Sequence, residues 1–565
     1  MIIITGKCMD SLITILTVLV LYGLAYFSYS KWFHRKVIQA DPKRMTPAHT
    51  YMDGVEFFPT NRYVLFGFQW KSIAALGPVV GPIIAIQWGW LPAILWILFG
   101  SIFIGWIHDY TSIMTSVRSE GASFGPISYE LISPRARTIL VSYIIFYLVL
   151  ILSSFTNVVA TTFASFPVSP IPVLVVTIVG VLSGYLIYKF KLNIVYTTVL
   201  AIVLMAVGIW LGMVFPFSVP KEYSLDFWMF WTLLFCFVGA VLPIWVFIQP
   251  INYLSFYLVY GAVIGMMGGI FAGQPDFARL AFTAFYDPKV TASGPLWPIM
   301  FVTIACGAIS GWHSLIGSSV SSKQLDSEPD AVFVGGGAMF AEGVLATIAV
   351  ITVAILAPAA VKGLAPAGIF VAGGSQLLGF LGLPADVGKA WVSVVVIILA
   401  ITIMHIALRI SRLATSELAG PRARGLLKKP YLSAFIIAVL VYILTSPRTG
   451  AAFSYIWGTF GGANQLMAGL ALMIATLWLT SKKRPSVYTA IPMLFMLATT
   501  IAALGYLAYT GMVLYVADPT KIGGLIASMI NVLLLVLGLY MCYEGARAFS
   551  RIRAGIKAKA TTGPA

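Results

Sequence analysis

Charged residues are scarce in this 565-residue chain, and acidic residues are scarcer than basic ones. Only 10% of the residues are Asp, Glu, Lys or Arg, whereas an ordinary soluble domain carries about 25%. This shortage excludes a soluble enzyme and a disordered protein, because so few charged groups cannot cover the apolar surface of a soluble globule of this size. The acidic residues number 19 against 35 Lys and Arg, which gives a net charge of +16.

Cysteine is also scarce, and its spacing carries no metal or disulfide pattern. The four cysteines are widely separated, and no C-x-x-C or His/Cys ligand spacing occurs: Cys8, Cys236, Cys306 and Cys542. This excludes a secreted disulfide scaffold, and we expect no cofactor and no bound metal. The cysteines within apolar runs are expected to be small buried hydrophobic residues.

What the chain has instead is apolar sequence. Hydrophobic residues make up 60% of it, and the mean hydropathy is +0.95. A membrane helix needs roughly 20 apolar residues, and the runs between charge and turn clusters predict an all-α polytopic membrane protein with about fifteen spans. These lie near 11–30, 63–87, 91–117, 138–165, 170–189, 193–216, 228–249, 253–272, 296–318, 334–360, 389–411, 431–447, 453–479, 487–511 and 523–546. The Gly/Pro/Ala-rich stretch 362–388 is left open between a loop and a re-entrant segment.

Basic residues set the predicted orientation, because cytoplasmic loops collect Lys and Arg. Six of them follow the first span, which places that segment in the cytoplasm and the N-terminus outside. Threading the other spans places 26 Lys and Arg in cytoplasmic loops and the C-terminal tail, against 8 in outer loops. We therefore predict a plasma membrane protein with a retained first span and a cytoplasmic C-terminus. The positive charge is then explained by topology, without a nucleic-acid partner.

Two breaks in the predicted helices suggest a repeat. The second span contains Gly77-Pro78 and Gly81-Pro82, and two Gly-Pro steps in the membrane disfavour a regular helix. The seventh span contains a weaker break at 239–245, which includes Leu242 and Pro243. Unwound backbone at membrane depth is tolerated where it lines a cavity. We expect both breaks to bind substrate, although a plain kink is the alternative for the first.

The two breaks lie five spans apart in opposite orientation, which is typical of inverted-repeat carriers. The predicted fold is a 5+5 inverted-repeat core of the LeuT/APC-like type with peripheral helices. The corresponding segments are 1–62 (anchor helix and basic loop), 63–217 (first repeat), 218–425 (second repeat) and 426–565 (peripheral C-terminal helices and basic tail).

A few charged side chains lie within predicted spans, where an ionisable group is a functional hypothesis by default. Lys71 either snorkels toward the inner face or acts in function. Asp109, next to His108, either couples ions or caps the helix near its cytoplasmic end. Glu342, after three glycines, is the second clear carboxylate in the hydrocarbon region.

The ninth span carries small and polar residues together. Gly311 permits close helix approach and is a candidate substrate-binding residue, as is His313 on the same helix. Ser310 and Ser314 supply oxygens of the kind that hard cations use. His313 is either a packing residue or a functional group on the same helix. In the thirteenth span, neutral amides are expected to join helices: Asn464 and Gln465.

At these residues the sequence resembles the carbon starvation (CstA) family, whose members carry peptides or pyruvate across prokaryotic plasma membranes. The likeness is scattered across about 40–475 and includes these blocks: Asp41–Ala48, Asp53-Gly54, Pro59–Asn61, Val64–Gly67, the double Gly-Pro, the Asp109 helix, Val241–Pro243, Tyr253–Ser255, Ile304–Gly307 through His313 to Gly337–Met339 and Glu342, Arg409-x-x-Arg412, Phe460-Gly461 and Ala463–Leu466.

The chain departs from the family pattern at several polar positions. Phe68 and Gln69 stand where the family usually has two histidines, and Lys71 stands where it has a small residue. Ile251-Asn252 replaces a usual Arg-Asp, and His405 replaces an aspartate. The region 362–388 is shorter than in long members.

The resemblance implies a secondary active transporter, not an enzyme, that takes up peptides or a small carboxylate such as pyruvate with H⁺. From the residues, Asp109, His313 and Glu342 are the candidates for proton coupling, and the serines of the ninth span are an alternative cation site. Lys71 could instead supply a fixed charge where an ion-dependent relative binds Na⁺. The alternatives are a Na⁺-coupled or ion-independent carrier for amino acids, a membrane-embedded metal enzyme using His108-Asp109, a passive channel and a membrane scaffold.

Overall fold

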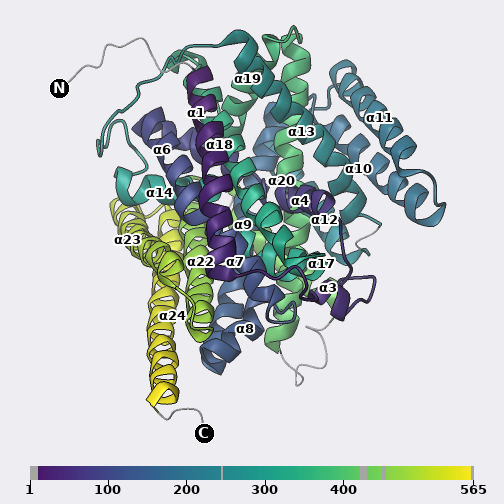
Figure 1. Ribbon diagram of the computed structural model, residues 1–565. Helices are drawn as coiled ribbons and strands as arrows, with labels where there is room; N and C mark the ends of the chain where they lie inside the picture. Colours follow the sequence, from purple (N-terminus) through teal and green to yellow (C-terminus); the bar gives the residue numbers. More distant parts are fainter. Residues whose placement is uncertain (1–10, 244–245, 420–428, 448–452, 562–565) are drawn as a thin grey trace.

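A computed structural model describes residues 11–243, 246–419, 429–447 and 453–561 of the chain (Figure 1). Within these ranges the molecule is a bundle of helices without a strand, and a single isolated bridge joins Thr60 to Leu325. Predicted features outside these ranges include Cys8, the basic residues at 422–428, and the last two residues of the 239–245 break.

Twelve helical segments in the described chain are long and apolar enough to cross a membrane. They are Ser11–Ile38, Trp90–Val117, Pro134–Ser165, Pro170–Ile187, Ile194–Val214, Lys221–Val241, Ile248–Gly273, Glu328–Ala354, Ala385–Leu418, Tyr455–Ser481, Val487–Ala517 and Ile522–Ile556. Each matches one of the spans predicted from hydropathy, because a run of apolar residues forms a helix that satisfies its own backbone in lipid. The chain is therefore a multi-pass membrane protein.

The remaining three predicted spans are irregular. The second is a bent pair, α4 (Arg62–Ile73) and α5 (Gly77–Ala85), which makes the count thirteen if it is taken as one span. The twelfth is the short helix α21 (Pro430–Thr445). The ninth is a chain of short pieces: η6 (Leu296–Met300), α14 (Phe301–Thr303), α15 (Ala305–Ala308), α16 (Gly311–Ile316), η7 (Gly317–Ser321) and α17 (Ser322–Gln324).

The break in the second span lies earlier than the sequence predicts. α4 and α5 meet at an angle of 48° across residues 74–76, whereas Gly77, Pro78, Gly81 and Pro82 are all helical within α5. Pro78 lies in the first turn of α5, where the missing N–H of proline has no intrahelical role, and Pro82 lies inside the same helix. The glycines then serve packing: a Cβ on Gly81 would lie 2.4 Å from the carbonyl oxygen of Thr303.

The predicted break at 239–245 falls where one helix ends instead of inside a single span. α12 (Lys221–Val241) ends before Leu242 and Pro243, and α13 (Ile248–Gly273) begins a new helix after them. Proline lacks the N–H that would continue the ladder, so here it ends the helix instead of kinking it. The second interrupted helix is the ninth span, where Ile309 and Ser310 are extended.

The stretch 362–388 contains neither a simple loop nor a full span. It holds α19 (Pro366–Gly379), a 14-residue helix that packs against α20 (Ala385–Ala419), α13 and α18 (Ala338–Ala354). Its glycines permit the contact, since a Cβ on Gly373 would lie 2.2 Å from the carbonyl oxygen of Thr352.

Burial divides the helices into interior and edge. In the most apolar stretch of each helix, 94% of the α20 residues and 100% of the α22 (Phe453–Ser481) residues are buried. α22 is therefore an interior helix, whereas it is predicted to be peripheral. By contrast, only 28% of the residues in the most apolar stretch of α11 (Ile194–Val214) are buried. α11 and α10 (Pro170–Gly184) project at one edge of the bundle, and α23 (Val487–Ala517) and α24 (Ile522–Thr561) lie at the other (Figure 1).

Residues predicted to be cytoplasmic come together at one end of the bundle. Arg118 donates to both carboxylate oxygens of Glu328 at 2.8–2.9 Å and to the carbonyl of Ile38. Arg484 donates to the same Ile38 carbonyl, and Lys323 pairs with Glu56 at 2.6 Å. The described part of the basic loops therefore shares one face, which we term the basic end; α24 ends on this side, and α1 (Ser11–Ala25) begins on the opposite side (Figure 1).

Candidate functional site

Three helices deliver polar side chains to one buried place. His108 and Asp109 come from α7 (Trp106–Val117), His313 from α16, and Glu342 from α18. A π-helical turn adjoins each of these three helices, at Ser101–Gly105, Gly317–Ser321 and Val332–Gly337. Such turns are rare and occur frequently at functional sites, because they rotate a side chain out of the regular helical register.

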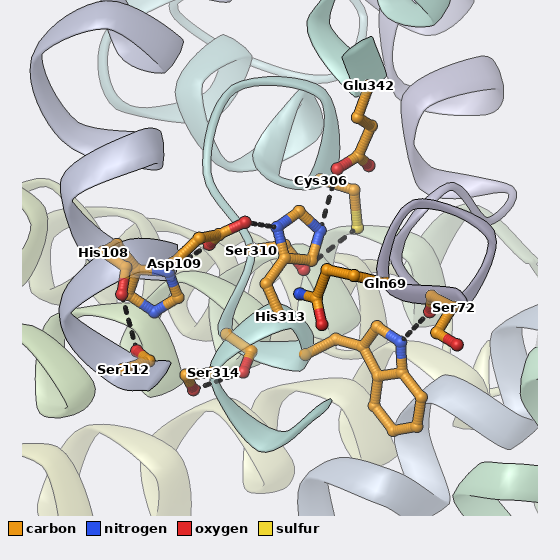
Figure 2. Close-up of polar contacts among 12 residues, drawn as sticks. Gln69, Ser72, His108, Asp109, Ser112, Cys306, Ser310, His313, Ser314 and Glu342 are labelled. Atoms are coloured by element: carbon orange, nitrogen blue, oxygen red, sulfur yellow. Dashed lines mark hydrogen bonds and ion pairs between the residues drawn. The ribbon is translucent and has the colours of Figure 1, made fainter. Parts of the chain in front are cut away.

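His313 lies between two carboxylates (Figure 2). Its Nδ1 is 3.0 Å from Oδ2 of Asp109, and its Nε2 is 2.9 Å from Oε2 of Glu342. The other oxygen of Asp109 lies 2.8 Å from Nδ1 of His108. We call His108, Asp109, His313 and Glu342 the acid–histidine cluster; none is more than 1% exposed.

The charge of this cluster depends on how many protons it holds. With both carboxylates ionised and both imidazoles neutral, it would carry two negative charges away from water, which is costly. One proton on His313 satisfies both neighbouring carboxylates, and a second proton makes the cluster neutral. Oε1 of Glu342 has no partner within the described chain, so this oxygen is the one most open to binding a proton.

The break next to His313 is held by α22. Asn464 Oδ1 accepts from Ser310 Oγ at 3.1 Å, from the Trp312 backbone N–H at 3.3 Å and from Tyr147. Gln465 donates to the carbonyl of Phe301. These two amides, expected to join helices, thus satisfy backbone groups that the interruption leaves free.

The serines that could hold a cation use their hydroxyls elsewhere. Ser314 Oγ donates to the Gly311 carbonyl at 2.7 Å, one turn earlier on its own helix, and Ser310 is bonded to Asn464. Within the described ranges, no group of three or more His, Cys, Asp and Glu is arranged to hold a metal ion.

Two of the predicted substrate regions lie apart from each other. α5, with both Gly-Pro pairs, packs directly on the interrupted span, since a Cβ on Gly77 would meet Cys306. Gly311 lies against α22 instead, where a Cβ would meet Met467 and the Asn464 carbonyl. Leu242 is not part of this contact. Its carbonyl accepts a hydrogen bond from Arg409 at 3.0 Å, and Pro243 is exposed.

Lys71 also lies outside the acid–histidine cluster. It is 3% exposed and does not snorkel; its Nζ donates to Thr402 Oγ1 on α20 at 2.7 Å. One turn along α20, His405 lies 3.4 Å from the side chain of Asn252. The departures from the family pattern at these positions are therefore neighbours in space. Sequence reasoning missed Thr402, because a threonine in an apolar run gives no signal of its own.

Comparisons with known proteins bear on what this arrangement does. The family model described as "Carbon starvation protein CstA" matches residues 10–372 and 360–503. The chain is 34% identical over 363 residues to the pyruvate/proton symporter BtsT of Escherichia coli K12, covering 62% of this chain and half of that protein.

Two peptide transporters match over more of their length. The peptide transporter CstA of Escherichia coli K12 is 29% identical over 85% of this chain and 78% of its own. That of Bacillus subtilis strain 168 is 26% identical over 96% of this chain and 98% of its own.

Among solved structures, a mutant of the manganese transporter of Eremococcus coleocola has a TM-score of 0.51 at 13% identity, over 87% of this chain and 96% of that one. Identity this low shows a similarity of fold alone.

Proposed function

Because the chain belongs to the carbon starvation protein CstA family, we propose that it is a secondary active transporter that takes up peptides or a small carboxylate such as pyruvate together with H⁺. The observation that carries the proton coupling is His313 between the carboxylates of Asp109 and Glu342, 3.0 and 2.9 Å away. The relatives support the substrate class: one is named a pyruvate/proton symporter and two are named peptide transporters.

The acid–histidine cluster suits one proton per cycle better than a cation such as Na⁺. A sodium ion prefers several oxygen ligands around one point, whereas here an imidazole stands between the two carboxylates. The serine hydroxyls of the same span are bonded to backbone or to Asn464. A proton needs only one acceptor, and Oε1 of Glu342 is a buried one without a partner in the described chain.

We propose that Gly77, Pro78, Gly81 and Pro82 on α5 line the substrate path where α5 meets the interrupted ninth span. Gly311 and His313 would lie on the other wall. Leu242 and Pro243 lie just after α12. They would contribute only through the Leu242 carbonyl, which accepts a hydrogen bond from Arg409.

For the fold, we propose an inverted-repeat core with about fifteen spans, the N-terminus outside and the C-terminus in the cytoplasm of a cell whose plasma membrane holds the protein. The proposed segments remain 1–62, 63–217, 218–425 and 426–565.

Transport by the purified full-length chain in proteoliposomes tests this function. A panel of pyruvate, di- and tripeptides and amino acids is offered under an inward pH gradient and, separately, under an inward Na⁺ gradient at the same membrane potential. We expect accumulation of pyruvate or a peptide with the pH gradient alone. Accumulation only with Na⁺ would exclude proton coupling, and no uptake of any compound would exclude the transport proposal.

A further inference from the structure

A second buried polar region, on the other side of α4, carries positive charge without an anion. Lys71 is 3% exposed, and its hydrogen bond to Thr402 is to a neutral hydroxyl. In the described chain, no carboxylate lies within 4.0 Å of its Nζ. A buried ammonium that lacks an anionic partner is costly in a membrane, so this position needs an explanation.

The basic residues of α20 extend this region toward the basic end. Thr402, His405, Arg409 and Arg412 are three or four residues apart, so they share one helix face. The first and last of these residues are ten positions apart, which is a rise of about 15 Å. With Lys71 they form what we term the cationic face.

The partners of the cationic face are neutral. Arg409 and Arg412 donate to the backbone carbonyls of Leu242 and Ala240, at the C-terminal end of α12. No ion pair to either guanidinium lies within the described residues.

His405 adds to this region a ring nitrogen that has no hydrogen-bond partner in the described chain. It is fully buried, lies within electrostatic range of Lys71, and packs beside the rings of Phe235 and Phe247. Its Nε2 faces Asn252, while its Nδ1 has no partner in the described chain. An ammonium, an amide N–H₂ and an imidazole nitrogen thus lie on or beside one face of α20, and these are groups that can donate hydrogen bonds to a carboxylate.

We propose that Lys71, His405 and Asn252 bind the carboxylate of the transported substrate, and that Arg409 and Arg412 continue the cationic face as its route to the basic end. This inference rests on the proposed transport function and adds the group of the substrate that is recognised. The carboxylate site and the acid–histidine cluster are linked by neighbouring residues: Ser72, next to Lys71, accepts a hydrogen bond at 2.7 Å from Trp312, next to His313.

The test compares a carboxylate with its amide in proteoliposomes containing the full-length chain. Uptake of labelled pyruvate or alanyl-alanine is measured by counterflow, which needs no proton gradient, with unlabelled alanyl-alanine or alanyl-alaninamide as competitor. A hydrogen-bonded charge contact of this kind changes affinity by about 10-fold or more. We therefore expect the amide to compete at least about 10-fold more weakly than the acid with the original chain.

Substitution of Lys71 separates a binding role from a packing role. Lys71→Met is expected to raise KM about 10-fold or more with a smaller change in maximal rate, and to abolish the preference for the acid over the amide. Lys71→Arg, which keeps the charge, should retain part of that preference. The exposed lysine variant Lys189→Met is the control and should behave as the original chain.

Each result has a definite reading. Equal competition by acid and amide in the original chain overturns the carboxylate site, whether or not the variants fold. Unchanged discrimination in Lys71→Met also overturns it while leaving the transport function standing. Absence of uptake of both labelled compounds by the original chain overturns the transport function and this inference together.

Discussion

At the scale of single residues, the chemistry depends on a histidine held between two acids. Asp109 and Glu342 come from different helices, and only His313 brings them into one hydrogen-bonded and ionic chain. A proton bound at either carboxylate changes the charge that the other two groups experience. In the proposed mechanism, this coupling lets the cluster respond to proton loading.

Neutral substitutions of the two acids should separate coupling from binding. Asp109→Asn and Glu342→Gln keep the side-chain volume but remove the site that gains and loses the proton. We expect each to abolish accumulation driven by a pH gradient while counterflow of substrate continues. The exposed Glu130→Gln serves as the control, and normal accumulation by Glu342→Gln would assign that carboxylate a structural role.

A second prediction concerns the buried ion pair at the basic end. Glu328 is fully buried and accepts hydrogen bonds from Arg118 and from the Asp41 backbone N–H. The hydrogen bond from Arg118 to Glu328 raises the pKa of Arg118 above its ordinary value. Because Arg118 stays charged, Glu328→Gln leaves an unpaired, largely buried guanidinium, which costs about 3–5 kcal/mol.

The expected result is a markedly lower Tm for purified Glu328→Gln. The matched control is Glu56→Gln, which breaks the ion pair with Lys323 where the Glu56 side chain is 56% exposed and should cost less than about 1 kcal/mol. Equal losses of Tm in the two variants would contradict the argument.

At the scale of helices, hydropathy was sufficient to predict the regular spans but not the interruptions. The twelve long helices follow from apolar runs, which dictate a helix wherever they meet lipid. The break at Ile309 and Ser310 contains no proline, and its backbone groups are satisfied by Asn464 and Gln465 from a distant helix. No local pattern carries that information.

The same limit applies to the candidate site. His108, Asp109, His313 and Glu342 could be selected from sequence because charged groups in apolar runs stand out. That three of them form one chain depends on the packing of α7, α16 and α18. Conversely, the prominent Gly-Pro pairs predicted an unwound segment, whereas they lie within a helix and permit a close contact.

The contact of α5 with the interrupted span gives a prediction at this scale. Gly81→Ala places a Cβ within 2.4 Å of the Thr303 carbonyl oxygen, and backbone atoms cannot rotate away as a side chain can. Overpacking of this kind costs about 1–3 kcal/mol, so the Tm should fall. Gly505→Ala on α23 has nothing within 4 Å of its Cβ, and should leave Tm unchanged or raise it, since alanine favours a helix. A higher Tm for Gly81→Ala would contradict the described packing.

At the scale of the whole molecule, the two ends of the bundle differ in charge. Arg118, Arg484 and Lys323 gather with Glu328 and Glu56 at the basic end. α18 runs from this end, beside Glu328, to the opposite one, where Lys362 follows it. The positive-inside rule assigns the basic end to the cytoplasm.

Thiol labelling of intact cells tests this orientation. In a chain whose native cysteines are replaced, Lys362→Cys should react with a membrane-impermeant maleimide, whereas Lys483→Cys should react only after permeabilisation. Both lysines are exposed in the structure, so accessibility reports the side of the membrane. The reverse pattern would invert the proposed topology, and labelling of both in intact cells would exclude the assignment of Lys483 to the cytoplasm.

The interrupted ninth span has a consequence for biosynthesis. Its short helical pieces leave backbone groups that cannot be satisfied in lipid, and the partner of the Trp312 N–H is Asn464, 152 residues further along the chain. When this span leaves the ribosome, the amide that stabilises it has not yet been translated. Until α22 enters the membrane, the Trp312 N–H lacks this partner. Assembly of the carrier's centre is thus a late, post-insertional step, and a chain truncated before α22 would leave that centre unfinished.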